Sequence, residues 1–460
     1  NKAHILMLAK TGIIKDDVAK KLLIATAQIE KEKDHPTFEI NPDVEDLYFN
    51  LERYLIKLTG LEVGGQQHTA RSRNDLFATE IRIDTRKVYL KLAQMMIDLR
   101  RAYLNLARKN LDSVMSGYTH MQPSEPITFA HYLSGVSFAL GRDYDRYARA
   151  WKALNLCPLG GCSMGSTSFP IDRNYTAELL GFDAPLQNSL DCVASRDYIL
   201  EILMNLSQTA MTMSRTALDL YNWATPEYGY IEVDDSCAVC SSIMPQKKNP
   251  FTLEHVKAKA AHLEGFMIGA YNTMKNVIFS HGRDTSVEAP RYFYTALSEM
   301  EADLALLTVT VNTLSVRKER MYDNAARNFC TVTELANYLV RHDGISFREA
   351  HEIIAHVVGN MNSRRLTAAD INRAAVNEAS QSLYGFDTKL TDELIREALD
   401  PKRVADEKTC IGGTQPAEVT RQLDLIEEQI KADEAVLAAR QEQLTNANTK
   451  LAAAVKAATV

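Results

Sequence analysis

Neither glycine nor proline occurs between Gly65 and Gly117, and this uninterrupted stretch limits the possible folds more than any other feature of the chain. Apolar residues recur along it at the spacing of a helix face, namely at Phe77, Ile81, Val88, Leu92, Met96, Leu99 and Tyr103. The pattern predicts a helix over about residues 75–109, on the order of 50 Å long at 1.5 Å per residue. One compact domain cannot cover a rod of that length.

Three further stretches predict long helices. Glycine and proline are again absent between residues 195 and 225 and between Pro290 and Arg320. The segment that follows Pro250, up to residue 277, has no proline and only two glycines, Gly265 and Gly269. Each predicted helix is amphipathic on more than one face, and such rods pack into bundles, often between chains. The period-two alternation of strands is nearly absent. We therefore predict an all-α protein with a central long-helix bundle.

Shorter predicted helices flank the bundle and divide the chain into three parts. An N-terminal helical domain, residues 1–72, holds helices at about 16–31 and 43–59. The central bundle domain spans residues 73–321. A C-terminal helical domain, residues 322–460, holds helices at about 346–360 and 367–380 and ends in an Ala-, Gln- and Glu-rich stretch, 427–460, which we expect to be a helix lying on the surface.

Composition excludes several classes of function. The formal net charge of −7, without dense lysine and arginine faces, argues against a nucleic-acid or anionic-membrane partner. No apolar run is long enough to span a bilayer, and the first residues lack the order of a signal peptide. Seven scattered cysteines are expected to be reduced thiols in a cytoplasm. Cys237 and Cys240 form a CxxC motif, but without a second Cys or His pair nearby we expect no zinc site.

The first of three polar clusters precedes the longest predicted helix and reads His68-Thr-Ala-Arg-Ser72-Arg73-Asn74-Asp75. Arginines with Ser and Asn at a helix N-terminus can bind a carboxylate, because backbone N–H groups, the helix dipole and a guanidinium fork all favour an anion. The alternative is a polar helix cap with surface arginines.

The second cluster, Gly117-Tyr118-Thr119-His120-Met121-Gln122-Pro123, is expected in a turn between two helices. A histidine flanked by hydroxyls and an amide can move protons near neutral pH. A hydrogen-bonded structural histidine is the alternative reading of His120.

The third cluster reads Cys240-Ser241-Ser242-Ile243-Met244-Pro245-Gln246-Lys247-Lys248-Asn249-Pro250, with Glu254 in the helix that follows. It is either a solvent-exposed loop or a site for an elimination that passes through a carbanion. For the second role it offers a hydroxyl that can act as a base, together with cations and amides that can hold a doubly charged intermediate.

The third cluster closely resembles the signature of the fumarase/aspartase superfamily, G-S-S-x-M-P-x-K-x-N-x-x-x-x-E, and departs from it only at Cys240, where the family has glycine. The other two clusters resemble the remaining superfamily regions in their argininosuccinate lyase forms. The resemblance covers nearly the whole chain. It implies a cofactor-free, three-domain, all-α homotetramer with a core of about twenty helices, in which regions from three subunits meet at each active site.

The implied reaction is a β-elimination that releases fumarate from an N-substituted aspartate through an aci-carboxylate intermediate. By similarity Ser241 is the base, with Ser242 as the alternative, and Lys247 and Asn249 stabilise its alkoxide. His120 is implied to pair with Glu254 and to act as the acid or orient the amine, and His68 is a second candidate acid. The residues implied to contact the substrate are Ser72, Arg73, Asn74, Thr119, Gln122, Ser242, Met244 and Asn249.

The segment Phe279-Ser-His281-Gly-Arg283-Asp284-Thr-Ser286-Val-Glu288-Ala289-Pro290 differs from the stretch with which argininosuccinate lyases contact the leaving amine. His281, Ser286 and Ala289 stand where that family has Tyr, Gln and Lys, and missing polar partners discriminate strongly between substrates. The chain therefore resembles more the ethylenediamine-N,N′-disuccinate lyases of this branch, whose substrate has a second succinyl arm that His281 or Arg283 can meet. Alternatively, Arg283 pairs structurally with Asp284 or Glu288.

Two other functions remain open. One is an argininosuccinate lyase of arginine biosynthesis in which the sequence of the amine-contacting segment has changed. The other is a non-catalytic, crystallin-like structural relative, against which the intact Ser241, His120, Lys247, Asn249 and Glu254 argue.

Overall fold

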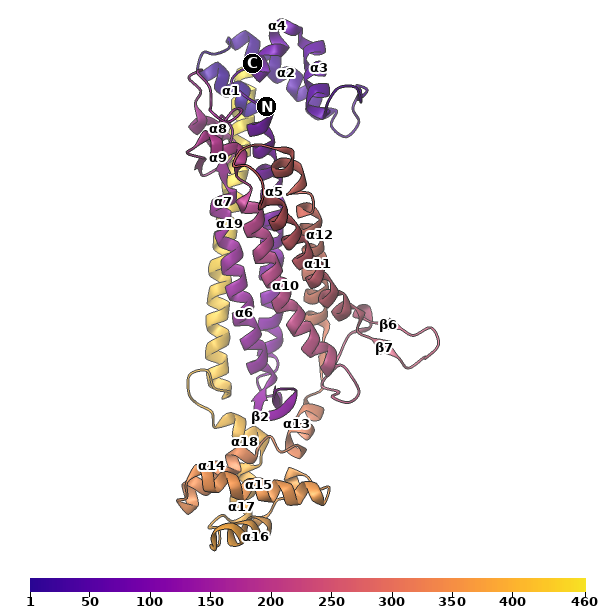
Figure 1. Cartoon of the computed structure of the whole chain (residues 1–460), viewed down its shortest axis with the longest axis vertical. Coiled ribbons are helices and arrows are strands. Elements are labelled where there is room, and N and C mark those ends of the chain that lie inside the picture. The colour runs from indigo at the N-terminus through magenta and orange to yellow at the C-terminus, as the bar shows by residue number, and fades with distance from the viewer.

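Long helices lying side by side form the centre of the molecule (Figure 1). The computed structural model describes residues 1–460. Buried apolar side chains of these rods make up most of a core of 55 residues. None of the helices is both long and apolar enough to cross a membrane. The predicted all-α architecture with a central long-helix bundle is confirmed. The rods are α5 (Arg73–Arg108), α6 (Phe129–Arg149), α10 (Asp197–Trp223), α11 (Phe251–Met274), α12 (Phe293–Thr313) and α19 (Pro416–Thr459).

Short helices cover one end of the rods, where both chain termini lie (Figure 1). A separate core of 13 buried residues holds this end together, and the last turns of α19 pack against it. The helices are α1 (Lys2–Lys10), α2 (Asp16–Lys31), α3 (Leu47–Thr59), α4 (Leu61–Gly64), η1 (Gly65–His68), α7 (Trp151–Leu154), α8 (Arg173–Leu179) and α9 (Ser189–Ala194).

A second group of short helices lies at the opposite end around its own core of 15 buried residues (Figure 1). From this end α19 runs back along α5 and α6. It starts earlier than predicted, and it does not merely lie on the surface, since Ile426, Ile430 and Leu437 are buried in the main core. The division of the chain at residues 72 and 321 stays a prediction. The helices of this end are α13 (Lys318–Arg327), α14 (Val332–Asp343), α15 (Phe347–Ser363), η4 (Ala368–Asp370), α16 (Arg373–Tyr384), α17 (Asp392–Ala398) and α18 (Pro401–Asp406).

Short strand pairs join the rods and correct two predictions. The expected turn around His120 is the tip of an antiparallel hairpin, β1 (Val114–Thr119) with β2 (Gln122–Thr128). The helix predicted from Pro290 to Arg320 stops at Thr313, because β8 (Ser315–Val316) pairs with β5 (Ile231–Glu232). The remaining short elements are β3 (Leu156–Cys157), β4 (Ala184–Pro185), η2 (Asp235–Cys237), β6 (Val239–Cys240), β7 (Lys248–Asn249) and the π-helical turn η3 (Asp284–Glu288).

Candidate active site

The start of α5 is fixed by a capping box. The Ser72 hydroxyl accepts the backbone N–H of Asn74, while the Asp75 carboxylate accepts the N–H of Ser72 at 3.0 Å. Asp75 is fully buried, and its second oxygen accepts the N–H groups of Gly160 and Cys162 at 2.8 and 2.9 Å. This cap places Arg73 and Asn74 in the first turn of α5, where the helix dipole favours an anion.

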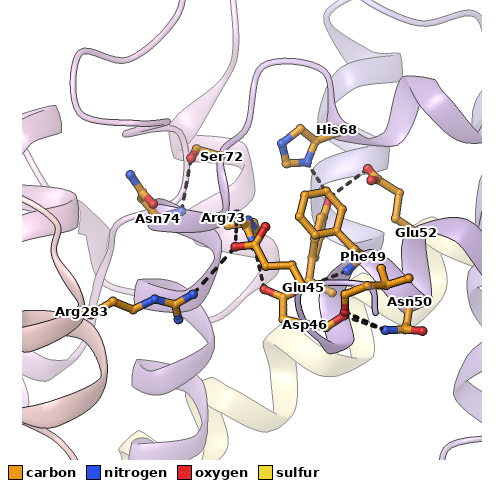
Figure 2. Close-up of polar contacts among 12 residues, drawn as sticks. Glu45, Asp46, Phe49, Asn50, Glu52, His68, Ser72, Arg73, Asn74 and Arg283 are labelled. Carbon is orange, nitrogen blue, oxygen red and sulfur yellow. Dashed lines mark hydrogen bonds and ion pairs between the residues drawn. The ribbon is translucent and has the colours of Figure 1, made fainter. Parts of the chain in front are cut away.

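Arg73 is already paired within the chain. Its two terminal nitrogens donate to one oxygen of Glu45 at 3.0 Å each, and one of them also donates to Asp46 at 2.7 Å. The guanidinium lies over the ring of Phe49, 4.5 Å from its centre. Figure 2 shows Glu45 between Arg73 and Arg283, with Arg283 reaching the same Glu45 oxygen at 3.8 Å.

A cavity of about 580 Å³ opens beside this network. Arg73 and Asn74 line it together with His281, Arg283 and Ser286, so the structure brings the first polar cluster and the proposed amine segment together. Carboxylates also line the cavity, from Glu45 and, on α5, from Glu80 and Asp84.

The surroundings of His281 favour its neutral form. Burial lowers the pKa of His281, and the positive charges of Arg196, Arg283 and Arg73 lower it further. The Nδ1 atom of His281 is buried without a hydrogen-bond partner. A neutral imidazole can present one N–H donor and one acceptor to a ligand, without adding a charge to the cavity.

Arg283 does not pair with Asp284 or Glu288. Its ion-pair partner is Glu45, whereas Glu288 pairs with Arg291 at 3.4 Å and the Asp284 carboxylate accepts the N–H of Thr285. The side chain of Arg283 is 71% exposed, so it can move toward a ligand.

His68 lies away from this cavity. It shares a short hydrogen bond with the hydroxyl of Tyr48, and Tyr48 also donates to Glu52 at 3.2 Å. Burial and the nearby charge of Arg71 lower the pKa of His68. In this arrangement His68 is a neutral partner of a tyrosine, half-buried behind the start of α5.

The hairpin tip presents the second cluster to solvent. Thr119, His120 and Gln122 are exposed, and the side chain of His120 makes no hydrogen bond within the chain. His120 and Met121 have φ angles of 53° and 59°, a conformation that costs non-glycine residues free energy and is often found at functional sites. The tip is anchored by a 2.6 Å hydrogen bond between the hydroxyls of Tyr118 and Tyr230.

The third cluster forms the loop between β6 and β7, which projects from the side of the bundle (Figure 1). The Oγ of Ser241 accepts the backbone N–H groups of Ile243 and Met244 at 3.3 and 3.1 Å. Two donors aimed at one hydroxyl oxygen also favour its negatively charged form. Ser242, Met244 and Lys247 are exposed on the loop.

The base of this loop is fixed by ion pairs. Lys248 pairs with Asp235 at 2.6 Å and with Glu232 at 3.2 Å, so it holds the loop and is not free for a ligand. Lys247 and Asn249 line a cavity of about 620 Å³. Glu254, in the first turn of α11, accepts a hydrogen bond from the hydroxyl of Tyr221 at 3.2 Å.

The chain does not bring its three polar clusters to one place. Thr119 lines a cavity of about 540 Å³ beside the hairpin, Lys247 and Asn249 line the cavity under the loop, and Arg73 lines the cavity at the start of α5. No hydrogen bond or ion pair joins His120 and Glu254, and the Glu254 carboxylate accepts from Tyr221 instead. In Figure 1 the hairpin lies toward the end that holds α13 and α18, whereas the start of α5 lies toward α1 and α3.

Sequence reasoning missed Glu45 and Arg196. Glu45 stands before a helix, next to Asp46, whose carboxylate caps that helix by accepting the N–H of Phe49, so both acids resemble ordinary capping residues. Arg196 is 1% exposed, and its Nε and one Nη atom have no acceptor. Only the folded chain shows that Arg196 lies near His281.

Two family models and several curated proteins match most of this chain in sequence. A family model described as Lyase matches residues 3–265, and one described as Argininosuccinate lyase C-terminal matches residues 329–406. Argininosuccinate lyase 1 of Shouchella clausii is 44% identical over 435 residues, covering 94% of this chain and 87% of the relative. Argininosuccinate lyase of Methanocaldococcus jannaschii is 36% identical over 428 residues, covering 93% and 87%.

Two solved structures are similar over the whole chain. The crystal structure of EDDS lyase in complex with formate has a TM-score of 0.93 at 32% identity and covers 100% of this chain and 90% of that one. A variant of EDDS lyase with bound fumarate has a TM-score of 0.92, with the same identity and coverage.

Proposed function

The chain belongs to the fumarase/aspartase superfamily, in its argininosuccinate lyase-like branch, and from this we propose that it eliminates fumarate from ethylenediamine-N,N′-disuccinate. It is a carbon–nitrogen lyase that releases fumarate. The identity of the leaving amine is the new element of the proposal.

The observation that carries the proposal is the lining of the cavity at the start of α5. Arg73, His281 and Arg283 converge there, and Ser286 takes the place of the glutamine of argininosuccinate lyases. The disuccinate has two arms, each with two carboxylates, and guanidinium groups bind carboxylates with matching geometry. Glu80, on the same wall, can face the ammonium nitrogens between the arms.

The reaction begins with removal of a proton from the carbon that is β to the amine and α to a carboxylate. We assign this step to Ser241 acting as its alkoxide. The N–H groups of Ile243 and Met244 already donate to its Oγ, and Lys247 adds a positive charge to the same loop. Removing one preorganised donor of this kind typically costs about 3 to 4 kcal/mol of transition-state stabilisation.

The electron pair left on carbon spreads into the neighbouring carboxylate and gives an aci-carboxylate. Asn249, Ser242 and Met244 of the loop would contact this group, while Ser72, Arg73 and Asn74 would hold the carboxylates of the aspartate half. The electron pair then forms the carbon–carbon double bond of fumarate as the carbon–nitrogen bond breaks. The amine leaves with a proton, for which His120 is the proposed donor and His68 the alternative.

We propose that three subunits of a homotetramer share each active site. The three clusters lie in separate places on one chain, and three of the cavities each hold one part of the required chemistry. Glu254 of one subunit would then pair with His120 of another. The exposed hairpin tip and the projecting loop are both free to take part in such a site.

Argininosuccinate is the second candidate substrate. The 44% identity to a protein named argininosuccinate lyase 1 favours it. The two substrates share the fumarate half, so only the amine end separates the candidates, and His281 and Ser286 disagree with the argininosuccinate pattern.

The experiment follows fumarate release in the ultraviolet from both substrates in parallel, with Ser241→Ala and Ser242→Ala as matched variants. Turnover of the disuccinate without turnover of argininosuccinate, abolished in Ser241→Ala and only reduced in Ser242→Ala, supports the proposal. The reverse substrate preference makes the chain an argininosuccinate lyase. No turnover of either substrate by a folded tetramer points to a third amine or to a structural, crystallin-like role.

A further inference from the structure

Glu45 joins three segments that meet at the cavity beside α5. It lies in the loop before α3, Arg73 begins α5, and Arg283 precedes η3. One Glu45 oxygen accepts both terminal nitrogens of Arg73 at 3.0 Å and faces Arg283 at 3.8 Å (Figure 2). Two guanidinium groups around one carboxylate form the arrangement in which a carboxylate ligand would be bound.

Glu45 is held in this place by the two arginines alone. Its carboxylate makes no other hydrogen bond or ion pair in the chain, and the side chain is 51% exposed. Asp46 differs, because it pairs with Arg73 through one oxygen and caps α3 through the other, which accepts the N–H of Phe49. A ligand that competes for the arginines would therefore displace Glu45 and leave Asp46 in position.

We propose that Glu45 is a displaceable internal ligand that selects for leaving amines bearing a carboxylate, since only a carboxylate on the amine can replace it on Arg283. The inference rests on the proposed function, because it places the aspartate half at Arg73 and the amine at Arg283. An amine with a neutral or cationic arm leaves Glu45 on Arg283. Partly exposed ion pairs are weak, so a substrate carboxylate can compete for the guanidinium groups.

A binding role of Glu45 toward a cationic amine fits the geometry less well. Its charge is already offset by two positive charges within 4 Å. The carboxylates of Glu80 and Asp84 line the same cavity without an arginine partner, Asp84 pairing only with the exposed Lys87 at 3.0 Å, and they are better placed for an ammonium group.

The test compares Glu45→Gln with the unchanged tetramer on two substrates. Ethylenediamine-N,N′-disuccinate has a second dicarboxylate arm, whereas N-(2-aminoethyl)aspartate, the product of one elimination, ends in an ammonium group. We expect Glu45→Gln to lower KM for the disuccinate by about two- to fivefold and to change KM for the aminoethyl compound less. Asp43→Asn is the matched control, because it removes one charge from the same loop at an exposed side chain without an arginine partner, and it should change neither KM.

A second measurement separates this inference from the identity of the amine. The dissociation constant of fumarate is measured in the Ser241→Ala background with and without Glu45→Gln. Fumarate carries a carboxylate for Arg73 whatever the amine, so Glu45→Gln should tighten fumarate binding about two- to fivefold. Tighter fumarate binding without any turnover of the disuccinate would overturn the amine assignment alone. Unchanged or weaker binding of fumarate, or a raised KM for the disuccinate, would overturn the role given to Glu45.

Discussion

The carboxylate of Asp75 and the backbone N–H of Gly160 are joined by a 2.8 Å hydrogen bond that ties the start of α5 to the loop before α8. The same oxygen accepts the N–H of Cys162, and the other oxygen accepts the N–H of Ser72. Burial raises the pKa of Asp75, although these three hydrogen bonds act against the rise. Asp75 thus fixes the helix turn that carries the candidate anion site.

Asp75→Asn should lower stability and weaken substrate binding together. An amide has only one acceptor oxygen for three N–H donors, two of them buried, and its NH₂ group would face at least one of them. We expect a loss of about 2 to 4 kcal/mol in the free energy of unfolding. Asp98→Asn, on an exposed turn of the same helix, is the control and should stay within about 0.5 kcal/mol. Equal melting temperatures for the two variants at one protein concentration would contradict the assignment.

The contact between α5 and α19 allows a prediction from two neighbouring ion pairs. Arg100 is 2% exposed and pairs with Asp433 at 2.5 Å, whereas Arg101 and Glu434 form an ion pair in which both side chains are more than a third exposed. Asp433→Asn leaves a buried guanidinium without its counter-charge and should cost about 3 kcal/mol or more. Glu434→Gln should cost less than about 1 kcal/mol.

Thermal unfolding of both variants at low and high salt checks this prediction. The loss in Asp433→Asn should persist at high salt, because a buried pair is little screened, while any loss in Glu434→Gln should fade. If the two substitutions cost the same, Arg100 does not depend on Asp433.

The long rods were predictable because their signals are local. The helix expected over residues 75–109 is α5, Arg73–Arg108, and the one expected over residues 195–225 is α10, Asp197–Trp223. Glycine and proline mark the ends, and helical periodicity fills the interior. The all-α class therefore followed from the spacing of a few residue types.

The errors came from contacts between residues far apart in the sequence. Nothing near Thr313 ends the predicted helix, and α12 stops there because Ser315 and Val316 pair with residues more than eighty positions earlier. Arg73 and Arg283 line one cavity, but the sequence carries no sign that Glu45 bridges them. Such pairings depend on how the rods pack, and no local pattern encodes them.

A buried carboxyl group in α12 makes stability depend on pH. Asp303 is fully buried, and both its oxygens lack hydrogen-bond partners. Burial raises the pKa of Asp303 to about 8, while the nearby Lys259 is paired with Glu299 at 2.6 Å. The folded state therefore keeps a proton that the unfolded state loses near its ordinary pKa of 3.8.

It follows that Asp303 lowers stability as pH rises from about 4 to about 8, with no further change above that range. Asp303→Asn removes this dependence and should raise the free energy of unfolding at pH 8 by about 2 kcal/mol or more. Melting temperatures of the variant and the unchanged protein should converge toward pH 4 and separate toward pH 8. A constant difference across this range would show that Asp303 does not titrate as described.

His281 leads to a prediction with the opposite dependence on pH. Its pKa lies below the ordinary value of 6.5 because of burial and the charges of Arg196, Arg283 and Arg73. As pH falls, His281 takes up a proton at a higher pH in the unfolded chain than in the folded chain. The free energy of unfolding therefore decreases as pH drops below 6.5, until the pKa of His281 in the folded chain is passed. Removing one of the charges should bring the folded pKa back toward the ordinary value.

Arg283→Gln is the variant for this test, because its exposed side chain can be replaced with little effect on folding. We expect the pKa of His281, followed by NMR of labelled histidine, to rise in Arg283→Gln. Arg291→Gln removes one charge from the same segment, but Arg291 pairs with Glu288 and does not act on His281, so the pKa of His281 should not change. A pKa that stays low in Arg283→Gln would mean that burial, Arg196 and Arg73 lower the pKa of His281 without Arg283.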